Sequence, residues 1–538
     1  MKRTILLIIL LGATLAANAQ SPRFKLGKWT EIQTAILQEL NRSYVDSLPI
    51  DRIERRGIDA MLAELDPYTV FIPEEENEDL QMMLHKTYGG IGAVIFKPDV
   101  QGPVIINEPY ANSPAAKNGL QCGDEIYAID GESVAGLTSQ QSSEKMRGDP
   151  GTQVTFQVKK LRTGEMVDIV VTRERIKLGD IEFAGMLDDK VGYISQTGFT
   201  DGVGDEFRQK VVELKKQGMQ LLVLDLRGNG GGLMNEAAEI VSAFVPKGSV
   251  VVSAHGRDPR ASYVLRTEKA PVDTKLPVIV LVDSGSASSS EIVAGALQDM
   301  DRATIMGERT FGKGLVQSIR SLPYGGELKV TTAKYYTPSG RCVQAIDYAQ
   351  RREDGSVAHI PDSLTHEFKT AHGRSVRDGG GITPDVALDF REYSRLTYSL
   401  VGYGVIEQYA LEFVRKHENI PAVADFRLSD EDYEDFIAFA KGKEFDYRSS
   451  AKTYFDRAKE ELKRDGLDEA MQAELDALEK SLNMEKEDFL RLKKSEIVPF
   501  IEEEIVVRYY FQEAGVQVRI RYDDALRQAI ASERIKQY

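Results

Sequence analysis

A serine-rich turn at residues 285–291 (GSASSSE) joins two different patterns and limits the folds open to this chain. Before it, residues 276–283 form a short apolar run rich in β-branched side chains, which predicts a fully buried strand. After it, residues 291–298 have apolar side chains at helical spacing. Ser288 and Glu291 fit a capping box, in which a serine and a glutamate three residues later bond each other's backbone N–H groups. For the turn by itself, serines that merely cap a helix are the simpler interpretation.

A lysine 25 residues after Ser288 gives the turn a chemical interpretation. Lys313 lies between two glycines in a mostly uncharged segment, and Gln317 follows it. A serine hydroxyl is a weak nucleophile until a base takes its proton, and a lysine is such a base only when its amine is neutral. Burial lowers a lysine pKa by up to about 3–5 units from its usual ~10.4. Ser288 and Lys313 therefore predict acyl-transfer chemistry by a Ser/Lys dyad.

A second glycine-rich turn, residues 227–233 (RGNGGGL), follows another buried apolar run at 220–226. Glycine lets a backbone N–H approach a ligand with no Cβ in the way, and two such groups aimed at one developing alkoxide form an oxyanion hole. The expected donors are the N–H of Gly231 or Gly232 and the N–H of Ser289. A flexible turn without a ligand is the alternative interpretation.

These segments together resemble the signatures of the carboxyl-terminal processing (tail-specific) serine proteases, and the likeness spans roughly residues 30–390. The matching segments are 225–233 (DLRGNGGGL), 286–295 (SASSSEIVAG), 307–317 (GERTFGKGLVQ) and 332–341 (TAKYYTPSGR). The resemblance implies Ser288 as nucleophile, Lys313 as general base and Gln317 as the residue that orients the lysine. It also implies a crotonase-like core. The chain departs from the family at Ser289, where alanine is common, and at Gly230, where many members have proline; neither change removes a backbone donor.

Residues 88–174 resemble a PDZ domain, a mostly β module. Residues 88–96 (YGGIGAVIF) are similar to its carboxylate-binding loop and the peptide-binding strand that follows. The N–H groups of Gly90, Ile91 and Gly92 would capture a terminal carboxylate while the substrate tail adds a strand to an exposed sheet edge. Arg147 matches an arginine that links the PDZ domain to the active centre in similar proteases; a solvated loop charge is the alternative.

The whole chain is predicted to be a multidomain α/β protein with helical terminal regions. The expected boundaries are a signal peptide at 1–19, an N-terminal helical region at 20–87, the PDZ domain at 88–174, the Ser/Lys protease core at 175–390 and a C-terminal helical region at 391–538. Residues from about 24 to 85 read as helical. In the family this region helps form a dimer, so a homodimer is expected; a packing appendage is equally compatible with the sequence.

The C-terminal region is rich in charge. Glu, Lys and Arg alternate at helical distances over residues 451–492, which usually indicates a solvated helix face. A coiled dimerisation arm or a cover over the proteolytic tunnel is the more specific interpretation.

The opening residues predict export. Lys2 and Arg3 precede an apolar run at 5–11 and small residues at 17–19, the order found in a signal peptide. We expect a periplasmic protein of a bacterial envelope without an integral membrane span, because no later stretch is long and apolar enough to cross a membrane. The formal net charge of −16 argues against nucleic acid as a partner. The expected partners are proteins or peptides with free carboxyl-terminal tails, and an adaptor protein is a further candidate. No cofactor or metal is expected.

Other functions stay open at this point. A crotonase-type acyl-CoA enzyme would use the same fold and backbone donors, although the PDZ domain, the export signal and the Ser/Lys pair argue against it. An inactive PDZ scaffold would keep the motifs without turnover. Residues 307–313 nearly spell a P-loop, but Gly314 replaces the Ser or Thr that would hold magnesium. A Ser-His-Asp triad would need one of six histidines, none of which lies in a recognisable motif.

Overall fold

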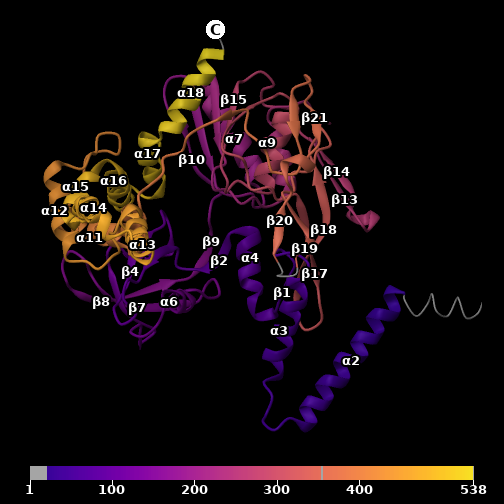
Figure 1. Cartoon of the computed structure of the whole chain (residues 1–538), viewed down its shortest axis with the longest axis horizontal. Coiled ribbons are helices and arrows are strands. Elements are labelled where there is room, and N and C mark those ends of the chain that lie inside the picture. Colours follow the sequence, from indigo (N-terminus) through magenta and orange to yellow (C-terminus); the bar gives the residue numbers. More distant parts are fainter. Residues whose placement is uncertain (1–20, 353–355, 537–538) are drawn as a thin grey trace, which may run out of the picture.

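The computed structural model describes residues 21–352 and 356–536, so the predicted signal peptide lies outside the described residues. The first helices, α2 (Pro22–Ser43) and α3 (Ile50–Ala63), form an arm that extends from the rest of the molecule (Figure 1). Residues 24–85 are not helical throughout. β1 (Val70–Ile72) follows α3 and pairs with a strand of the α/β part of the chain, before η1 (Glu74–Glu76) and α4 (Asn77–His85).

The predicted PDZ segment folds as an antiparallel sheet with its own apolar core. Val104, Ile106, Ile126, Phe156 and Val158 are all fully buried in it. Its strands are β3 (Ala93–Phe96), β4 (Val104–Pro109), β5 (Glu125–Ile129), β6 (Glu132–Ser133), β7 (Gln153–Lys159) and β8 (Met166–Thr172). Its helices are α5 (Pro114–Lys117) and α6 (Ser139–Met146). The strands β2 (Thr87–Gly90) and β9 (Glu174–Lys177), at the two ends of this segment, form a separate antiparallel pair. β3 lies at the edge of the sheet, where an added strand could pair.

A six-stranded sheet forms the centre of the α/β part. In spatial order its strands are β10 (Ile181–Met186), β11 (Val191–Gln196), β12 (Leu221–Asp225), β15 (Val278–Val282), β16 (Thr304–Gly307) and β23 (Val386–Ala387). All neighbours are parallel except β10 and β11. β12 and β15 are buried along their whole length, as their continuous apolar runs predict.

Helices cover both faces of this sheet. α7 (Val203–Lys216), α8 (Met234–Ser242) and α9 (Ser289–Asp299) pack on the face that carries Leu222 and Leu224. Val516 and Leu526, from the end of the chain, pack on the opposite face against Leu221 and Val223. The C-terminal helices therefore complete the core of the α/β part.

A second sheet lies beside the first; it carries the predicted glutamine, and the predicted lysine lies in the loop that leads into it. Its order is β1, β18 (Glu327–Tyr336), β13 (Val250–Gly256) and β14 (Tyr263–Arg266), and β17 (Leu315–Ser321) also pairs with β18. Short elements complete this part: η2 (Pro259–Ala261), β19 (Ile346–Arg351), β20 (Val357–His359), η3 (Asp362–Leu364), β21 (Glu367–Lys369) and β22 (Ser375–Arg377). Segment 307–314 leads into β17, a strand, whereas a P-loop would open a helix.

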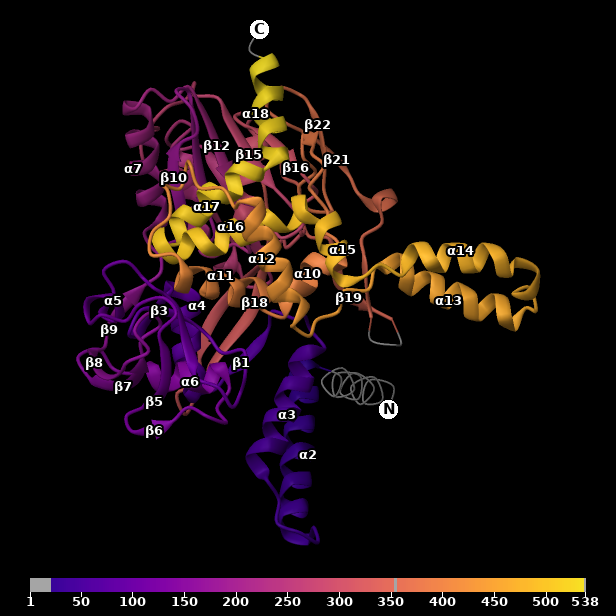
Figure 2. The same ribbon diagram turned by 90° about the vertical axis from the view of Figure 1, so that its left-hand side faces the viewer.

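The C-terminal part is helical and has its own core, which includes Tyr409, Phe436 and Ile501. Its elements are α10 (Arg395–Gly402), α11 (Val405–Lys416), α12 (Asp430–Lys441), α13 (Ser450–Arg464), η4 (Glu469–Met471), α14 (Gln472–Leu482), α15 (Lys486–Leu492), α16 (Lys494–Tyr510), α17 (Gln512–Tyr522) and α18 (Asp524–Lys536). α13 and α14 form a hairpin that projects away from the body (Figure 2). Over the described residues, none of the helices has the length and apolar character to cross a membrane.

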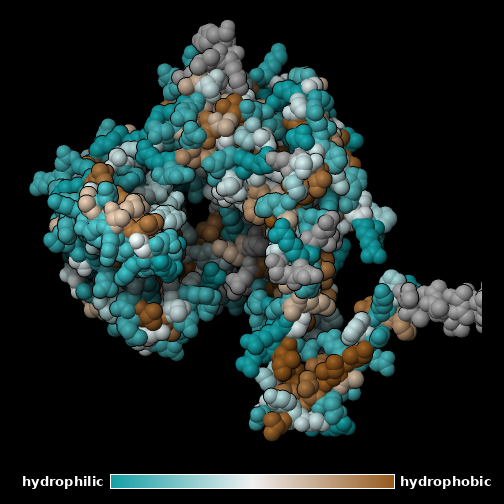
Figure 3. Space-filling model, in the orientation of Figure 1, coloured by the Kyte–Doolittle hydropathy of each residue, from teal (hydrophilic) through white to brown (hydrophobic). Residues whose placement is uncertain are grey.

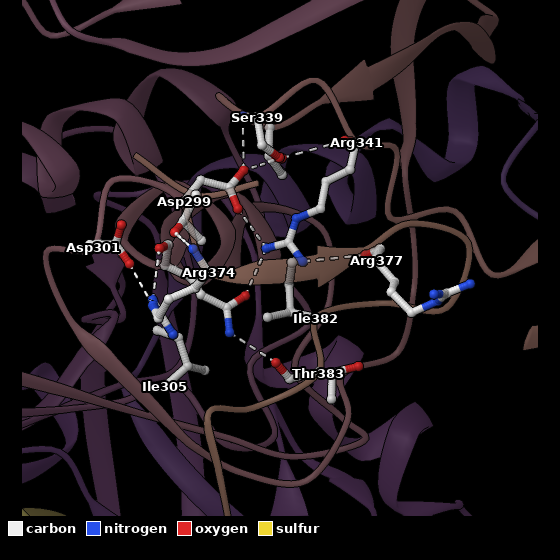
Figure 4. A network of polar contacts seen from close by, with 12 residues as sticks. Asp299, Asp301, Ile305, Ser339, Arg341, Arg374, Arg377, Ile382 and Thr383 are labelled. Atoms are coloured by element: carbon white, nitrogen blue, oxygen red, sulfur yellow. Dashed lines mark hydrogen bonds and ion pairs between the residues drawn. The ribbon is translucent and has the colours of Figure 1, made fainter. Parts of the chain in front are cut away.

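A buried ion pair fixes the end of α9 to the segment after β18 (Figure 4). Arg341 and Asp299 are 2.8 Å apart, and each side chain is 1% exposed. Arg341 also donates to Gln298 Oε1 at 2.7 Å, while Asp299 accepts from Ser339 N at 3.0 Å and from the Thr337 hydroxyl. The sequence 337–341 (TPSGR) is therefore an anchor for the helix that begins beside Ser288.

Replacing Arg341 with methionine is expected to lower the free energy of unfolding of the α/β part by about 3–5 kcal/mol. The change leaves the Asp299 carboxylate buried without its cation, which is the costly way to break such a pair. Thermal unfolding followed by calorimetry measures the effect, with the exposed Arg377→Met as control. Equal unfolding temperatures for the two variants would contradict the anchoring role.

Candidate active site

Ser288 occupies a strained turn between β15 and α9. Its φ of 58° and ψ of −112° are uncommon for a residue with a side chain, so the surrounding contacts must hold it in place. Its N–H donates to Glu291 Oε2 at 2.9 Å, and its carbonyl accepts from the buried Tyr335 hydroxyl at 3.1 Å. Ser288 lines a cavity of about 590 Å³, hereafter the catalytic cavity.

Lys313 lines the same cavity from the loop before β17. Burial lowers the pKa of its ammonium to about 8, and the charge of Lys329 acts in the same direction. The carboxylates of Glu291 and Asp66 raise this pKa, but their effect is smaller than that of burial. The Lys313 Nζ lies 4.2 Å from the centre of the Tyr68 ring. Burial and the nearby Lys329 charge therefore favour the neutral amine of Lys313 more than water does.

Gln317 also lines the catalytic cavity, but its amide bonds to a neighbouring strand. Its Nε2 donates to Thr331 Oγ1 at 3.2 Å, and Thr331 N donates in turn to Thr69 Oγ1 at 3.2 Å. The structure thus brings Gln317 to the same cavity as Lys313 and fixes it to β18 and the segment before β1.

The second glycine turn approaches Ser288 closely. A Cβ on Gly231, whose φ is 97°, would lie 2.7 Å from the Ala287 carbonyl oxygen and 2.8 Å from Ser289 N, so only glycine fits there. The Gly231 N–H donates to Asn229 Oδ1 at 2.9 Å. Ser289 is the first residue of α9, and its hydroxyl donates to the Gly232 carbonyl at 2.8 Å. The N–H groups of Gly232 and Ser289 are accordingly the better candidates for an oxyanion hole than that of Gly231.

Glu291 connects the two halves of the site, a role that the sequence analysis missed. Its side chain is fully buried and accepts four hydrogen bonds of 2.6–2.9 Å, from Ser288 N, Lys313 N, Gly312 N and the Thr310 hydroxyl. One carboxylate therefore sets the distance between the Ser288 turn and the Lys313 loop. The capping pattern predicted the contact with Ser288, but no sequence signal pointed to the contacts 19–22 residues away.

Changing Glu291 to glutamine is expected to lower kcat/KM by about 10²-fold, because an amide cannot accept from donors on both sides and the two loops lose their common anchor. The loss of charge also lowers the pKa of Lys313, since the Glu291 carboxylate raises it. The measurement is the pH profile of kcat/KM beside that of Glu308→Gln, an exposed control. A Glu291→Gln profile whose rising limb has not moved would contradict this role.

The predicted carboxylate-binding loop opens a second, smaller cavity. Gly90 and Ile91 line a groove of about 220 Å³ between β3 and α6. Gly92 has a φ of 72°, and a Cβ there would meet the Ser113 Cβ at 2.7 Å. Arg147 follows the last residue of α6 and lines the same groove, with its guanidinium 5.3 Å from the centre of the Tyr88 ring. Arg147 thus lies at the peptide groove and is not among the described residues that line the catalytic cavity.

Histidines and metal ligands do not gather at the site. Among the described residues that line the catalytic cavity there is no histidine, which leaves a Ser-His-Asp arrangement without its base there. Within the described ranges no group of His, Cys, Asp and Glu has the geometry to hold a metal ion. Ser288 and Lys313 are among the described side chains that line this cavity.

Comparison with known families gives three matches along the chain. Residues 190–350 match peptidase family S41, residues 105–160 match the PDZ domain, and residues 396–532 match the probable PDZ-protease C-terminal helical domain. The chain is 33% identical to a carboxy-terminal-processing protease of Bartonella bacilliformis over 63% of its own length and 79% of the relative.

Similarity extends to two further proteins. The chain is 35% identical to the carboxyl-terminal-processing protease of Synechocystis over 62% of its own length and 81% of the relative. The solved photosystem II D1 C-terminal processing protease is 27% identical, with a TM-score of 0.35, over 65% of this chain and 91% of that one.

Proposed function

Because this chain belongs to the carboxyl-terminal processing serine proteases of peptidase family S41 and carries a PDZ domain, we propose that Ser288 and Lys313 form its catalytic dyad. The observation that carries this proposal is that both side chains line one cavity, in which burial lowers the pKa of Lys313 to about 8. The strained backbone of Ser288 supports it, since such strain clusters at functional sites.

The proposed reaction has two halves. Ser288 Oγ forms a bond to the carbonyl carbon of the scissile peptide and its proton passes to Lys313 Nζ. The N–H groups of Gly232 and Ser289 stabilise the resulting oxyanion, with Gly231 as the alternative donor. The intermediate expels the amine, which takes the proton from the Lys313 ammonium. Water then attacks the acyl carbon and gives a proton to Lys313 Nζ. The bond between the acyl carbon and Ser288 Oγ breaks, and the Lys313 ammonium returns the proton to Ser288 Oγ as the new carboxyl end leaves. Gln317 acts by holding the wall beside Lys313.

Substrate capture falls to the peptide groove. We assign the terminal carboxylate of a protein tail to the N–H groups of Gly90, Ile91 and Gly92, and the preceding residues to the free edge of β3. Arg147, at the rim of the same groove, is the candidate for sensing an occupied groove. Residues 88–174 would then act as the capture domain and residues 175–390 as a protease core of crotonase-like type, between helical regions at 20–87 and 391–538.

The test is cleavage of unstructured proteins and peptides by residues 20–538, with fragments mapped by mass spectrometry. Peptides with a free carboxyl end should be cut at least tenfold faster than the same peptides with a carboxyl-terminal amide. Equal rates for acid and amide would contradict capture of the carboxylate. If no substrate is cut and a serine-reactive probe does not label Ser288, the chain is a PDZ scaffold and not a protease.

The N-terminal arm is proposed to join two copies in a homodimer in the periplasm, after removal of residues 1–19. None of the side chains of α2 is buried, and Leu26 and Trp29 are 71% and 63% exposed. The hydrophobic surface of the arm is visible in Figure 3. Such a surface on a helix marks an interaction site.

Introducing Leu26→Glu together with Trp29→Glu is expected to convert the dimer into a monomer, because two charges would be buried in the contact. Light scattering during size-exclusion chromatography measures the mass. The matched control is Gln33→Glu with Gln38→Glu, which adds the same charge at exposed polar positions of α2. A monomeric unmodified chain would exclude the homodimer, and an adaptor protein would then be the candidate for the arm.

A further inference from the structure

A larger chamber has wall residues in common with both the peptide groove and the catalytic cavity. This chamber, hereafter the antechamber, has a volume of about 820 Å³. It shares Met82, Tyr110 and Leu178 with the peptide groove, and Lys86 and Thr197 with the catalytic cavity. Because neighbouring cavities have wall residues in common, one extended chain could pass from the groove into the catalytic cavity.

Four parts of the molecule contribute to the antechamber wall, and Met82 and Lys86 come from the N-terminal helical region. The PDZ part supplies residues 111–114 and 174–177, and the α/β part supplies Ile181 and Glu182. Gln512, the first residue of α17, comes from the C-terminal helical part. Figure 3 shows an opening between the lobe formed by the PDZ and C-terminal parts and the lobe that contains the α/β part.

Gln512 is held in place by the PDZ part. Its backbone N–H donates to Glu108 Oε1 at 3.1 Å, and its side-chain amide bonds to the other oxygen of this carboxylate. Glu108 is buried and lies on β4, the strand that pairs with β3. One turn before, Arg508 donates to Asn107 Oδ1 at 2.5 Å. Phe511 between them has a φ of 67°, which is costly for a residue with a side chain and fixes the bend from α16 into α17.

Helix α17 and its C-cap residue are also fixed to the α/β part. Arg519 lies 2.9 Å from Glu182, which is itself an antechamber residue, and Asp523 lies 2.6 Å from Arg227 at the start of the glycine turn. A second cavity of about 800 Å³ is lined by Tyr193 and Tyr522, and it has Glu182 and Thr197 in common with the antechamber. α17 thus contacts the PDZ part at its first residue and the α/β part near its end, and its residues line both cavities.

We propose that the α16–α17 junction, with Gln512 at its centre, forms one wall of the path along which an unfolded substrate tail runs from the peptide groove to Ser288. The inference rests on the proposed function and adds a role for the C-terminal helical part. The ligand is an extended polypeptide with a free carboxyl end; a folded domain does not fit a chamber of this size.

Crosslinking tests this path directly. Three variants of the full Ser288→Ala chain each carry one benzophenone side chain. It replaces Gln512 in the first variant, Val94 of the peptide groove in the second and Tyr510, the control, in the third. Tyr510 is exposed beside the junction and lies outside the described lining of the antechamber. The probe is an unstructured peptide with a free carboxyl end, and its carboxyl-terminal amide is the reference. We expect irradiation to crosslink the acid peptide at positions 94 and 512, at least fivefold above the amide, and not at position 510.

The outcomes separate the inference from the function on which it rests. Crosslinking at position 94 without crosslinking at position 512 would overturn the path and leave capture in the groove intact. No crosslinking at either position would overturn capture itself and the inference with it. Equal crosslinking at positions 510 and 512 would show contact without a path and would also overturn the inference.

A kinetic variant covers the case in which the benzophenone chains fold poorly. Gln512→Trp narrows the antechamber and keeps the backbone N–H bond to Glu108. The measured quantity is the ratio of kcat/KM for a tailed peptide to the rate constant with which a small fluorophosphonate labels Ser288. Because the small probe needs no tail path, we expect this ratio to fall at least tenfold. Tyr510→Trp should leave this ratio within twofold of the original. An unchanged ratio in Gln512→Trp would overturn the inference.

Discussion

The Ser288→Ala chain is expected to lose cleavage by a factor on the order of 10⁴–10⁶ and still bind substrate tails. Removing the hydroxyl removes the atom that forms the acyl bond, whereas the peptide groove lies in a separate cavity. Alanine keeps the Cβ and the backbone N–H that donates to Glu291, so the turn should keep its geometry. The rate of peptide cleavage and the anisotropy of a labelled tail peptide, measured on the same preparation, test both halves of this prediction.

The neighbouring serines provide matched controls. The Ser289 hydroxyl donates to the Gly232 carbonyl and the Ser290 hydroxyl donates to the Asn229 carbonyl at 2.8 Å, so each has a structural partner. Ser289→Ala and Ser290→Ala should each reduce kcat/KM by less than about tenfold, because each loses one buried hydrogen bond. A Ser288→Ala chain that cuts as fast as Ser289→Ala would show that the nucleophile is assigned to the wrong serine.

The elements around Ser288 could be predicted because their signals are local. The apolar runs at 220–226 and 276–283 became β12 and β15, and the helical spacing after Ser288 became α9. A strand buried on both faces has a continuous apolar sequence, and a helix start has a cap, so both can be recognised within ten residues or so.

Contacts between distant segments could not be predicted in this way. β1 is three residues long, lies in a stretch that reads as helical and exists because it pairs with β18 more than 250 residues later. The four hydrogen bonds of Glu291 and the bond from Gln317 to Thr331 depend on how separate loops meet. The strain at Ser288 is likewise set by its surroundings and leaves no mark in the sequence.

The C-terminal helices illustrate the same limit. Alternating charge over residues 451–492 predicts a solvated face, and α13 and α14 form a projecting hairpin there. The packing of the following helices has no comparable signal in the sequence, because α17 and α18 contact the α/β sheet through small and branched side chains such as Val516, Ala525 and Ala529. Their partner surface, the second face of a parallel sheet, is known only once the sheet is assembled.

Lys313→Arg is expected to lower kcat by about 10²–10⁴-fold while keeping a cation of similar reach. The guanidinium stays protonated at every accessible pH and cannot accept the proton of Ser288. In the unmodified chain the Lys313 pKa is about 8, so about one molecule in ten carries a neutral amine at pH 7. Activity should rise about tenfold per pH unit below pH 8 and level off above it. A flat profile from pH 6 to pH 10 would contradict a titrating lysine as base.

Two substitutions near Lys313 should move this rising limb in opposite directions. The charge of Lys329 lowers the pKa of Lys313, so Lys329→Met should shift the limb to higher pH. The charge of Asp66 raises this pKa, so Asp66→Asn should shift the limb to lower pH, and its amide oxygen can still accept from Tyr68 N and Thr69 N. A change in packing alone has no reason to give two shifts of opposite sign. Opposite shifts would therefore identify the titrating group as Lys313. If the rising limbs of both variants coincide with that of the unmodified chain, the controlling proton belongs to another residue.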